Sequence, residues 1–319
     1  MTAIILLNWN GADDTICCLR SLGAAEGEFF VVVADNGSTD NSVGRLEAFV
    51  SERSWCRQSM KVHVLPLEQN YGFARGNNIA LEFARTFGPD SYLLLNNDTE
   101  VAPDFLTRIL EFSGKNPEYR AITPKINYFS DKDRIWNCGG TIRFGRLNYF
   151  HANARDTELC GEEYLKISFI SGCALFFYPD LLEDGKLLTE RFFFGEEDFD
   201  FSLRMKRKRI QMACVMSSQI YHKVGASRGT LTPEKIYLSY LCRFIDIRNH
   251  FSRAGNFLWR IMYLPRCVQV FMRNGTGFGA AAGLTRRLYA DSLRKQGVSS
   301  TDYRKLVIEG TYFDEWKNK

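Results

Sequence analysis

The amino-acid sequence predicts an α/β protein with a doubly wound, mostly parallel sheet flanked by helices and followed by a C-terminal helical region. Three observations lead to this fold class. Short runs in the first hundred residues are almost continuously apolar, as strands covered on both faces are. Stretches with helical spacing of apolar residues separate these runs, and strand–helix–strand repetition is typical of parallel sheets. From about residue 232 the pattern becomes helical throughout.

The elements follow one another in a regular order. The first half contains four expected strands, at residues 3–7, 29–35, 61–67 and 91–96. Amphipathic helices are expected between them, at residues 13–25, 40–52 and 76–87. The middle of the chain mixes polar loops with strand-like pieces, at residues 141–150 and 167–178. The last part has three expected helices, at residues 233–253, 256–272 and 280–297.

The charge of the chain is divided unevenly. Residues 1–203 carry 19 Lys and Arg against 30 Asp and Glu, whereas residues 204–319 carry 22 against 7, so a net charge of +4 hides an acidic front and a basic rear. An acidic half suits a divalent cation, and a basic half suits an anionic surface, either nucleic acid or membrane. The nine cysteines form no C-x-x-C pair, which favours reduced thiols of a cytosolic protein and argues against a zinc site. The apolar N-terminus has no basic leader or cleavage site and is expected to be a buried strand.

Polar clusters follow three of the expected strands, where ligands bind in parallel sheets. The first cluster is Asn8-Trp9-Asn10-Gly11. The second, Asp35 to Asp40, has the carboxylate and amides to hydrogen-bond a nucleobase and ribose, although the same residues are also favoured in a turn and helix cap. Asn96-Asn97-Asp98 ends the fourth strand, and its lone carboxylate is a candidate ligand for Mg²⁺ or Mn²⁺ on a diphosphate. A helix cap is the alternative, and Thr99 or Asp104 offers that cap instead.

The segment from Asn70 to Asn78 combines two glycines, three asparagines and Arg75 at the start of an expected helix. The N-terminus of a helix favours a phosphate group, so the segment is a candidate diphosphate site. A solvated turn is the alternative, but a turn requires neither Arg75 nor the asparagine pair.

An acidic cluster runs from Glu196 to Asp200 among phenylalanines. Like-charge repulsion and burial raise the pKa of clustered carboxyls, which makes one of them a candidate general base. The alternative, an acidic first helical turn, explains the charges but not the aromatic residues around them. His222 is one of only four histidines and, taken alone, is expected to be structural; beside Asp98 it becomes a candidate second metal ligand.

Taken in order, these clusters resemble the family 2 glycosyltransferases of the GT-A fold, particularly bacterial enzymes that build polysaccharide chains, including rhamnosyltransferases. The resemblance covers about residues 1–230 and depends on the joint order of six motifs: NWNG (8–11), DNGSTD (35–40), NYGFARGNN (70–78), LLLNNDTE (93–100), EEDFDFSLR (196–204) and YHKVGAS (221–227). It implies a catalytic region at 1–230, with a nucleotide-binding half at about 1–100 and an acceptor half at about 101–230. Residues 231–319 form a basic helical region.

The resemblance also implies a role for each matching residue. Asp198 would be the catalytic base, closing the pair with Glu197, and Asp98 and His222 would hold Mg²⁺ or Mn²⁺. The family usually has Asp-x-Asp where this chain has Asn96-Asn97-Asp98, which places the metal-binding role on Asp98. The acceptor would meet the small-residue loop Ser171-Gly172-Cys173. The donor would contact Asn8, Asn10, Asp35, Asn36, Ser38, Asn70, Gly72, Arg75, Asn78, Asn97 and Asp98.

The activity implied is inverting, metal-dependent transfer of a sugar from a UDP- or dTDP-sugar to a saccharide or lipid-linked saccharide, in cell-surface polysaccharide synthesis. We expect a cytoplasmic protein, peripheral to the membrane if the basic, apolar helices bind anionic lipid; packing on the core or a homo-oligomer contact is the alternative for these helices. Residues 256–272 are too short and too charged to span a bilayer. A nucleic-acid-binding protein leaves the acidic clusters unexplained, and a nucleotidyltransferase does not need the base. A catalytically inactive binding module has only Asn96 in its favour.

Overall fold

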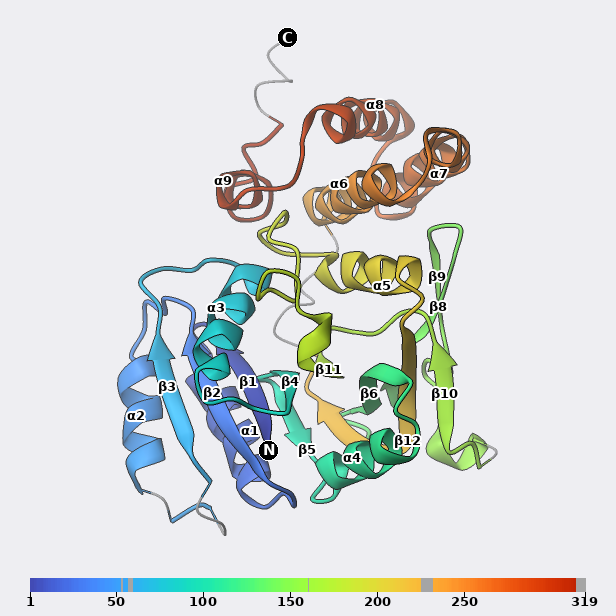
Figure 1. Ribbon diagram of the computed structural model, residues 1–319. Coiled ribbons are helices and arrows are strands. Elements are labelled where there is room, and N and C mark those ends of the chain that lie inside the picture. The colour runs from blue at the N-terminus through green and yellow to red at the C-terminus, as the bar shows by residue number, and fades with distance from the viewer. Residues whose placement is uncertain (53, 57–59, 160, 225–231, 314–319) are drawn as a thin grey trace.

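The computed structural model describes residues 1–52, 54–56, 60–159, 161–224 and 232–313, and within them one large sheet organises the fold (Figure 1). Its strand order is β10-β12-β6-β11-β4-β1-β2-β3, with β5 paired to β12 and β7 paired to β6, while β8 and β9 form a separate hairpin. The strands are β1 (Thr2–Asn8), β2 (Phe29–Asp35), β3 (Val62–Pro66), β4 (Ser91–Asn96), β5 (Thr99–Val101), β6 (Tyr119–Tyr128), β7 (Ile135–Asn137), β8 (Gly140–Arg143), β9 (Arg146–Tyr149), β10 (Tyr164–Ile167), β11 (Ala174–Phe177) and β12 (Gln211–His222).

The centre of the sheet is mostly parallel, which confirms the predicted fold class. Strands β3, β2, β1, β4, β6 and β12 run in one direction, and β11 lies antiparallel between β4 and β6. Asn8 is in register with Asp35, and Leu7 is in register with Asn96. The carboxyl ends of these strands therefore lie along one edge of the sheet.

Helices cover both faces of the sheet. Alternate strand residues point to opposite faces, and the two faces have separate cores. One core joins the β1 residues Ile4 and Leu6 to α1 (Ala12–Gly23), α2 (Ser42–Glu52) and α4 (Phe105–Lys115). The other joins Ala3 and Ile5 to α3 (Phe73–Arg85) and α5 (Glu197–Arg207). This alternation explains why the strands are apolar along their whole length.

The segment between β10 and β11 differs from the sequence prediction. Residues 167–178 were expected to be strand-like throughout, but β10 ends at Ile167 and β11 begins only at Ala174. The loop between them passes along the edge of the sheet, where the carbonyl of Cys173 accepts a hydrogen bond from the amide of Asn96 (2.8 Å). Short 3₁₀ turns, η1 (Asp156–Glu158) and η2 (Pro179–Leu181), complete this half.

A third core joins the C-terminal helices to the rest of the molecule. It combines Phe199 and Leu203 of α5 with residues from α6 (Pro233–His250), α7 (Arg253–Arg273) and α8 (Phe278–Arg294). The chain continues through α9 (Ser300–Tyr303) and η3 (Arg304–Ile308). The hydroxyls of Thr232 and Ser252 cap α6 and α7 by accepting backbone N–H groups. In the described part of the chain, no helix has the length and apolar character needed to cross a membrane.

The packing of α7 corrects part of the expectation for the basic tail. The basic, apolar helices were expected to bind anionic lipid, but Trp259 and Phe271 of α7 are fully buried. Arg260 is 4% exposed, and its guanidinium bonds the hydroxyl of Ser292 (2.8 Å). These residues form the side of α7 that packs on α6 and α8. The exposed apolar residues of α7 lie elsewhere, at Phe257, Leu258, Ile261, Met262 and Met272.

Candidate active site

The edge of the sheet carries a hydrogen-bonded network centred on Asp35. This carboxylate is 1% exposed and accepts bonds from the side-chain amide of Asn8 (2.7 Å) and from the amide and hydroxyl of Ser38 (2.8 and 2.7 Å). Asn10 extends the network, since its side-chain oxygen Oδ1 accepts the backbone amide of Thr39 (2.8 Å). The sequence-predicted residues Asn8, Asn10, Asp35 and Ser38 are thus brought together. Their bonds fix the loop geometry. Among the described residues Oδ1 of Asp35 accepts only the amide of Ser38, which leaves it one acceptor position.

Asn36 and Asn70 join this network to the start of α3. The Asn36 side chain donates to Asn70 (3.0 Å) and to the carbonyl of Gly72 (3.2 Å), and Asn70 in turn accepts the amide of Gly72 (2.8 Å). Gly37 and Gly72 have positive φ angles of 68° and 81°, and a Cβ at either would collide with the backbone of Gln69 or Phe193, respectively. Gly72 therefore serves close backbone packing beside the site.

Arg75 and Asn78, both predicted to contact the donor, have different surroundings. Arg75 is exposed on the first turn of α3, lies over the ring of Tyr71 (4.4 Å), and has no ion-pair partner within the described ranges. A free guanidinium at a helix N-terminus suits a phosphate. Asn78 corrects the prediction: it is 3% exposed, and its amide bonds the backbone of Leu187 and Leu188 and the carboxylate of Glu190. It anchors the loop before α5 and has no hydrogen-bonding capacity left for a donor.

Asp98 and His222 meet at the same edge, although they are far apart in sequence. Asp98 follows β4 and His222 ends β12, two strands that run in the same direction, and β5 pairs His222 with Thr99. Nε2 of His222 lies 3.1 Å from Oδ1 of Asp98, and no other charged partner of this carboxylate is found in the described part of the chain. Asn97 does not join them, because its amide bonds the hydroxyl of Thr15 (2.9 Å). Residues 225–227 of the motif that contains His222 lie outside the described residues.

The acidic cluster opens α5. Burial and the charge of Glu196 raise the pKa of Asp198 to about 6. Burial raises the pKa of Glu197 to about 8, and its carboxyl accepts the amide of Gly195 (2.7 Å). At pH 7 Asp198 is therefore mainly ionised and Glu197 mainly protonated. The partly exposed Asp198 can accept a proton, whereas Glu197 is 6% exposed and faces its own loop.

The small-residue loop predicted to face the acceptor lies directly against Asp198. The amide of Gly172 donates to Oδ2 of Asp198 (3.3 Å), and the hydroxyl of Ser171 accepts the amide of Cys173 (3.3 Å). All three loop residues are buried, with Cys173 3% exposed. The loop borders the carboxylate through its backbone and offers the solvent no side chain.

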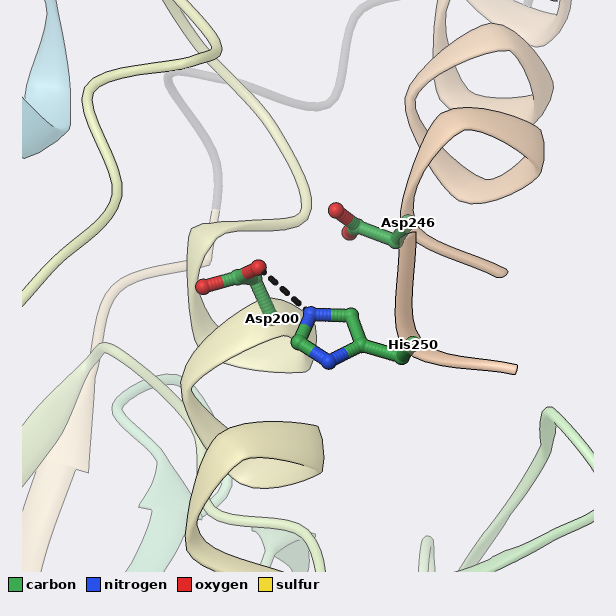
Figure 2. A group of neighbouring side chains, drawn as sticks. All are labelled: Asp200, Asp246 and His250. Carbon is green, nitrogen blue, oxygen red and sulfur yellow. Dashed lines mark hydrogen bonds and ion pairs between the residues drawn. The ribbon is translucent and has the colours of Figure 1, made fainter. Parts of the chain in front are cut away.

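A second group of carboxylates and histidine lies behind the base, between α5 and α6. Asp200, Asp246 and His250 lie close enough together to hold a metal ion (Figure 2). However, Asp200 already bonds Nε of Arg204 (2.9 Å) and Nε2 of His250 (2.8 Å), and Arg191 lies 3.4 Å from Asp200 and 3.6 Å from Asp246. Burial raises the pKa of Asp246 well above its ordinary value. Two guanidinium groups already pair with these carboxylates, so a dication there would have to compete with Arg191 and Arg204. We therefore assign these side chains to packing of the C-terminal helices on α5.

Sequence reasoning missed two residues of this region. Lys223 follows His222, donates its backbone amide to the carbonyl of Asp98 (3.0 Å) and forms an ion pair with Asp14 (2.8 Å). It lies in the YHKVGAS motif, in which only His222 was predicted to have a role. Arg243 of α6 forms an ion pair with Glu196 and lies 3.7 Å above the ring of Phe199. Nothing in the local pattern around Arg243 marks it, because its partners are more than forty residues away.

Comparisons with known proteins identify the family and agree with the fold. A family model described as glycosyl transferase family 2 matches residues 3–184, whereas a search of proteins with curated functions returns no match. Among solved structures, S. aureus TarS (residues 1–349) is 15% identical with a TM-score of 0.52 over 99% of this chain and 78% of that one.

Two further solved structures share the fold of this chain. The mannosyltransferase PcManGT from Pyrobaculum calidifontis, in complex with GDP-Man and Mn²⁺, is 12% identical with a TM-score of 0.57 and coverage of 99% and 83%. GalNAc-T7 with UDP, GalNAc and Mn²⁺ is 13% identical with a TM-score of 0.61 and coverage of 99% and 58%. At these identities the structural likeness establishes the fold, and the family model spans more than half of the sequence. The chain therefore belongs to glycosyltransferase family 2 and is a glycosyltransferase with the GT-A fold.

Proposed function

We propose that this chain is an inverting, metal-dependent glycosyltransferase that moves a sugar from a UDP- or dTDP-sugar to a hydroxyl group during cell-surface polysaccharide synthesis. The observation that carries the proposal is the position of Asp198: a partly exposed carboxyl with a pKa raised to about 6, facing the same edge region as Asp98 and His222 through the Gly172 loop. A base of this kind is what a direct displacement requires.

The proposed reaction is a single displacement. The acceptor hydroxyl attacks the anomeric carbon, its proton passes to Asp198, and the bond between that carbon and the diphosphate oxygen breaks. The nucleoside diphosphate leaves with the bonding electron pair. Asp198 accepts the proton and forms no covalent bond to the sugar, so the configuration at the anomeric carbon inverts.

Asp98 and His222 fit a divalent metal ion. Their facing oxygen and nitrogen atoms lie 3.1 Å apart, about the separation of neighbouring ligands on one ion. An imidazole nitrogen suits Mn²⁺ better than Mg²⁺, which prefers oxygen ligands. When bound, such an ion supplies positive charge for the departing diphosphate. PcManGT and GalNAc-T7 were each solved with Mn²⁺, which supports this assignment.

The remaining donor contacts follow from the network at the sheet edge. Asp35, with Asn8 and Ser38 holding it, is proposed to receive a donor N–H or O–H group on its free acceptor position. Arg75 is proposed to contact the diphosphate, because it is exposed at a helix N-terminus. TarS was solved with UDP-GlcNAc and PcManGT with GDP-Man, so the preference for a UDP- or dTDP-sugar is part of the proposal and is tested by the donor screen.

We also propose that α7 attaches the enzyme to the inner face of the cell membrane, where a lipid-linked saccharide would be the acceptor. Phe257, Leu258, Ile261 and Met262 are 54–64% exposed on this helix. Exposed apolar side chains beside basic ones provide both terms of interfacial binding. Substituting Phe257 and Ile261 by Ser should reduce co-sedimentation with anionic vesicles, whereas unchanged binding would leave these residues to a protein contact.

A donor-hydrolysis screen tests the central proposal. The full chain is incubated with a panel of sugar nucleotides, including UDP-GlcNAc, GDP-Man and dTDP-rhamnose, with and without Mn²⁺. We expect one UDP- or dTDP-sugar to release its nucleoside diphosphate only when the metal is present. Release of pyrophosphate would instead indicate a nucleotidyltransferase, and full turnover in excess chelator would exclude the metal.

A further inference from the structure

A cleft of about 330 Å³ opens between the β8–β9 hairpin, the start of α5 and the helices α6 and α7. None of the residues assigned to the donor or the metal lies in it. Its polar lining consists of three arginines, three tyrosines, one serine and a single carboxylate: Arg146, Arg243, Arg266, Tyr149, Tyr240, Tyr263, Ser239 and Glu196. In Figure 1, α6 and α7 lie above α5, and the β8–β9 hairpin stands beside it.

The charges in the cleft do not balance. Glu196 forms an ion pair with Arg243, and the two neutralise each other. Arg146 and Arg266 are exposed, and in the described ranges neither has an acidic partner. The cleft therefore carries about two uncompensated positive charges beside tyrosine side chains. Arginine prefers phosphate and carboxylate because its planar group donates two parallel hydrogen bonds.

The cleft adjoins the base. Glu196 immediately precedes α5 in the left-handed conformation (φ 68°), and its ion pair with Arg243 holds it in the wall of the cleft. Arg243 lies over the ring of Phe199, which directly follows Asp198 in the chain. Asp198 does not itself line the cleft, but the charges of two lining residues, Glu196 and Arg243, both act on the pKa of its carboxyl.

We propose that this cleft is an acceptor subsite that binds a phosphate group of the acceptor, holding a phosphorylated or phosphate-linked saccharide so that its hydroxyl reaches Asp198. The proposal rests on the function proposed above and specifies its acceptor class. The volume is larger than one phosphate requires and leaves space for an attached sugar. A neutral saccharide would leave Arg146 and Arg266 without a counter-charge.

Calorimetric titration of the full chain with glucose 6-phosphate, and with glucose as the neutral probe, tests the subsite. The variant carries Arg146→Gln and Arg266→Gln together; the matched control carries Arg143→Gln, in the same hairpin, and Arg253→Gln, on the same helix, both exposed and outside the cleft. We expect wild type and control to bind only the phosphate ester, and the cleft variant to bind it about tenfold more weakly. Equal affinity in all three proteins, or equal loss in variant and control, would overturn the proposal.

Two further measurements distinguish a failure of the acceptor subsite from a failure of the proposed function. Donor hydrolysis by the cleft variant should match that of wild type, because the donor residues lie outside the cleft. If wild type binds phosphate in the cleft but hydrolyses no donor, the proposed function is wrong and the anion site remains supported. Binding to phosphatidylglycerol vesicles distinguishes an acceptor phosphate from a lipid headgroup. If the cleft variant loses vesicle binding but keeps its affinity for glucose 6-phosphate, the cleft recognises lipid and the acceptor proposal is wrong.

Discussion

Two pairs of aspartate and histidine lie in this molecule, and their surroundings give them opposite characters. Asp98 and His222 meet at the carboxyl ends of parallel strands, and no guanidinium group contacts this carboxylate in the described ranges. Asp200 and His250 meet between two helices (Figure 2). Arg191 and Arg204 also contact Asp200 there. The ligand atoms are of the same kinds in both places. Charge balance and position decide which pair is available to a cation.

The same contrast exists within the first turn of α5. Asp198 and Asp200 are two residues apart, and their pKa values are shifted in opposite directions. Burial and the charge of Glu196 raise the pKa of Asp198 to about 6. Burial also acts to raise the pKa of Asp200, but the hydrogen bond from His250 and the charge of Arg204 outweigh it and hold the pKa below its ordinary value. One carboxylate is poised to take a proton, and the other is fixed in its ionised form.

The largest expected effect is on catalysis by Asp198. Asp198→Asn keeps the shape of the side chain but cannot accept a proton, so turnover should fall by about 10²–10⁴-fold while donor affinity stays nearly unchanged. Steady-state transfer kinetics and donor titration measure the two quantities. If Asp198→Asn retained more than about a tenth of the rate and Glu197→Gln did not, Glu197 would be the base.

The free energy of unfolding should fall more on replacement of Asp200 than on replacement of Asp198. Asp200→Ala leaves Arg204 and His250 without their shared partner, and breaking a buried ion pair costs about 3–5 kcal/mol in the free energy of unfolding. Asp246→Asn is the control, because burial raises the pKa of Asp246 well above its ordinary value and so favours the uncharged carboxyl, which Asn resembles in shape. Urea unfolding should show a change within about 1 kcal/mol for this control. A loss of stability in Asp246→Asn equal to that in Asp200→Ala would contradict the raised pKa of Asp246.

Metal binding should follow the first pair and not the second. Asp98→Ala removes a ligand and should weaken Mn²⁺ binding by about 10²-fold, raising the KM for donor and lowering kcat together. His250→Ala should leave Mn²⁺ affinity within about twofold of wild type, measured on protein that remains folded. Loss of Mn²⁺ binding in His250→Ala but not in Asp98→Ala would reverse our assignment of the two clusters.

Much of this arrangement was predictable, because it depends on local patterns. Apolar strands separated by amphipathic helices predicted the sheet, and polar residues after three of the strands predicted the edge where Asp35 and Asp98 lie. Binding of the donor at this edge stays a prediction. The proximity of Asp98 and His222 follows from two strands running in one direction; their role as metal ligands stays a prediction. The contacts of Asn78 and the partners of Arg243 were not predictable, since they depend on loops and helices distant in sequence. Helical periodicity also did not reveal that α7 buries Trp259 and exposes Phe257.

The smallest expected effect concerns stability as a function of pH, and it separates Asp198 from Asp200 without any assay of activity. The pKa of Asp198 is about 6 in the folded chain and about 3.8 as the ordinary value. Because the folded carboxyl holds its proton more tightly than the unfolded one, its contribution to stability is present below about pH 4 and is lost as the pH rises through about 6. Above pH 6 the folded protein carries the full cost of a partly buried charge. Asp198→Asn removes that charge, so the variant should be about 1–3 kcal/mol more stable than wild type at pH 8 and equal to it near pH 4. Urea unfolding at the two pH values measures the difference, with Asp184→Asn, an exposed carboxyl in an earlier turn, as the control. A variant that is less stable at pH 8, or a difference that does not change with pH, would show that the surroundings of Asp198 do not raise its pKa.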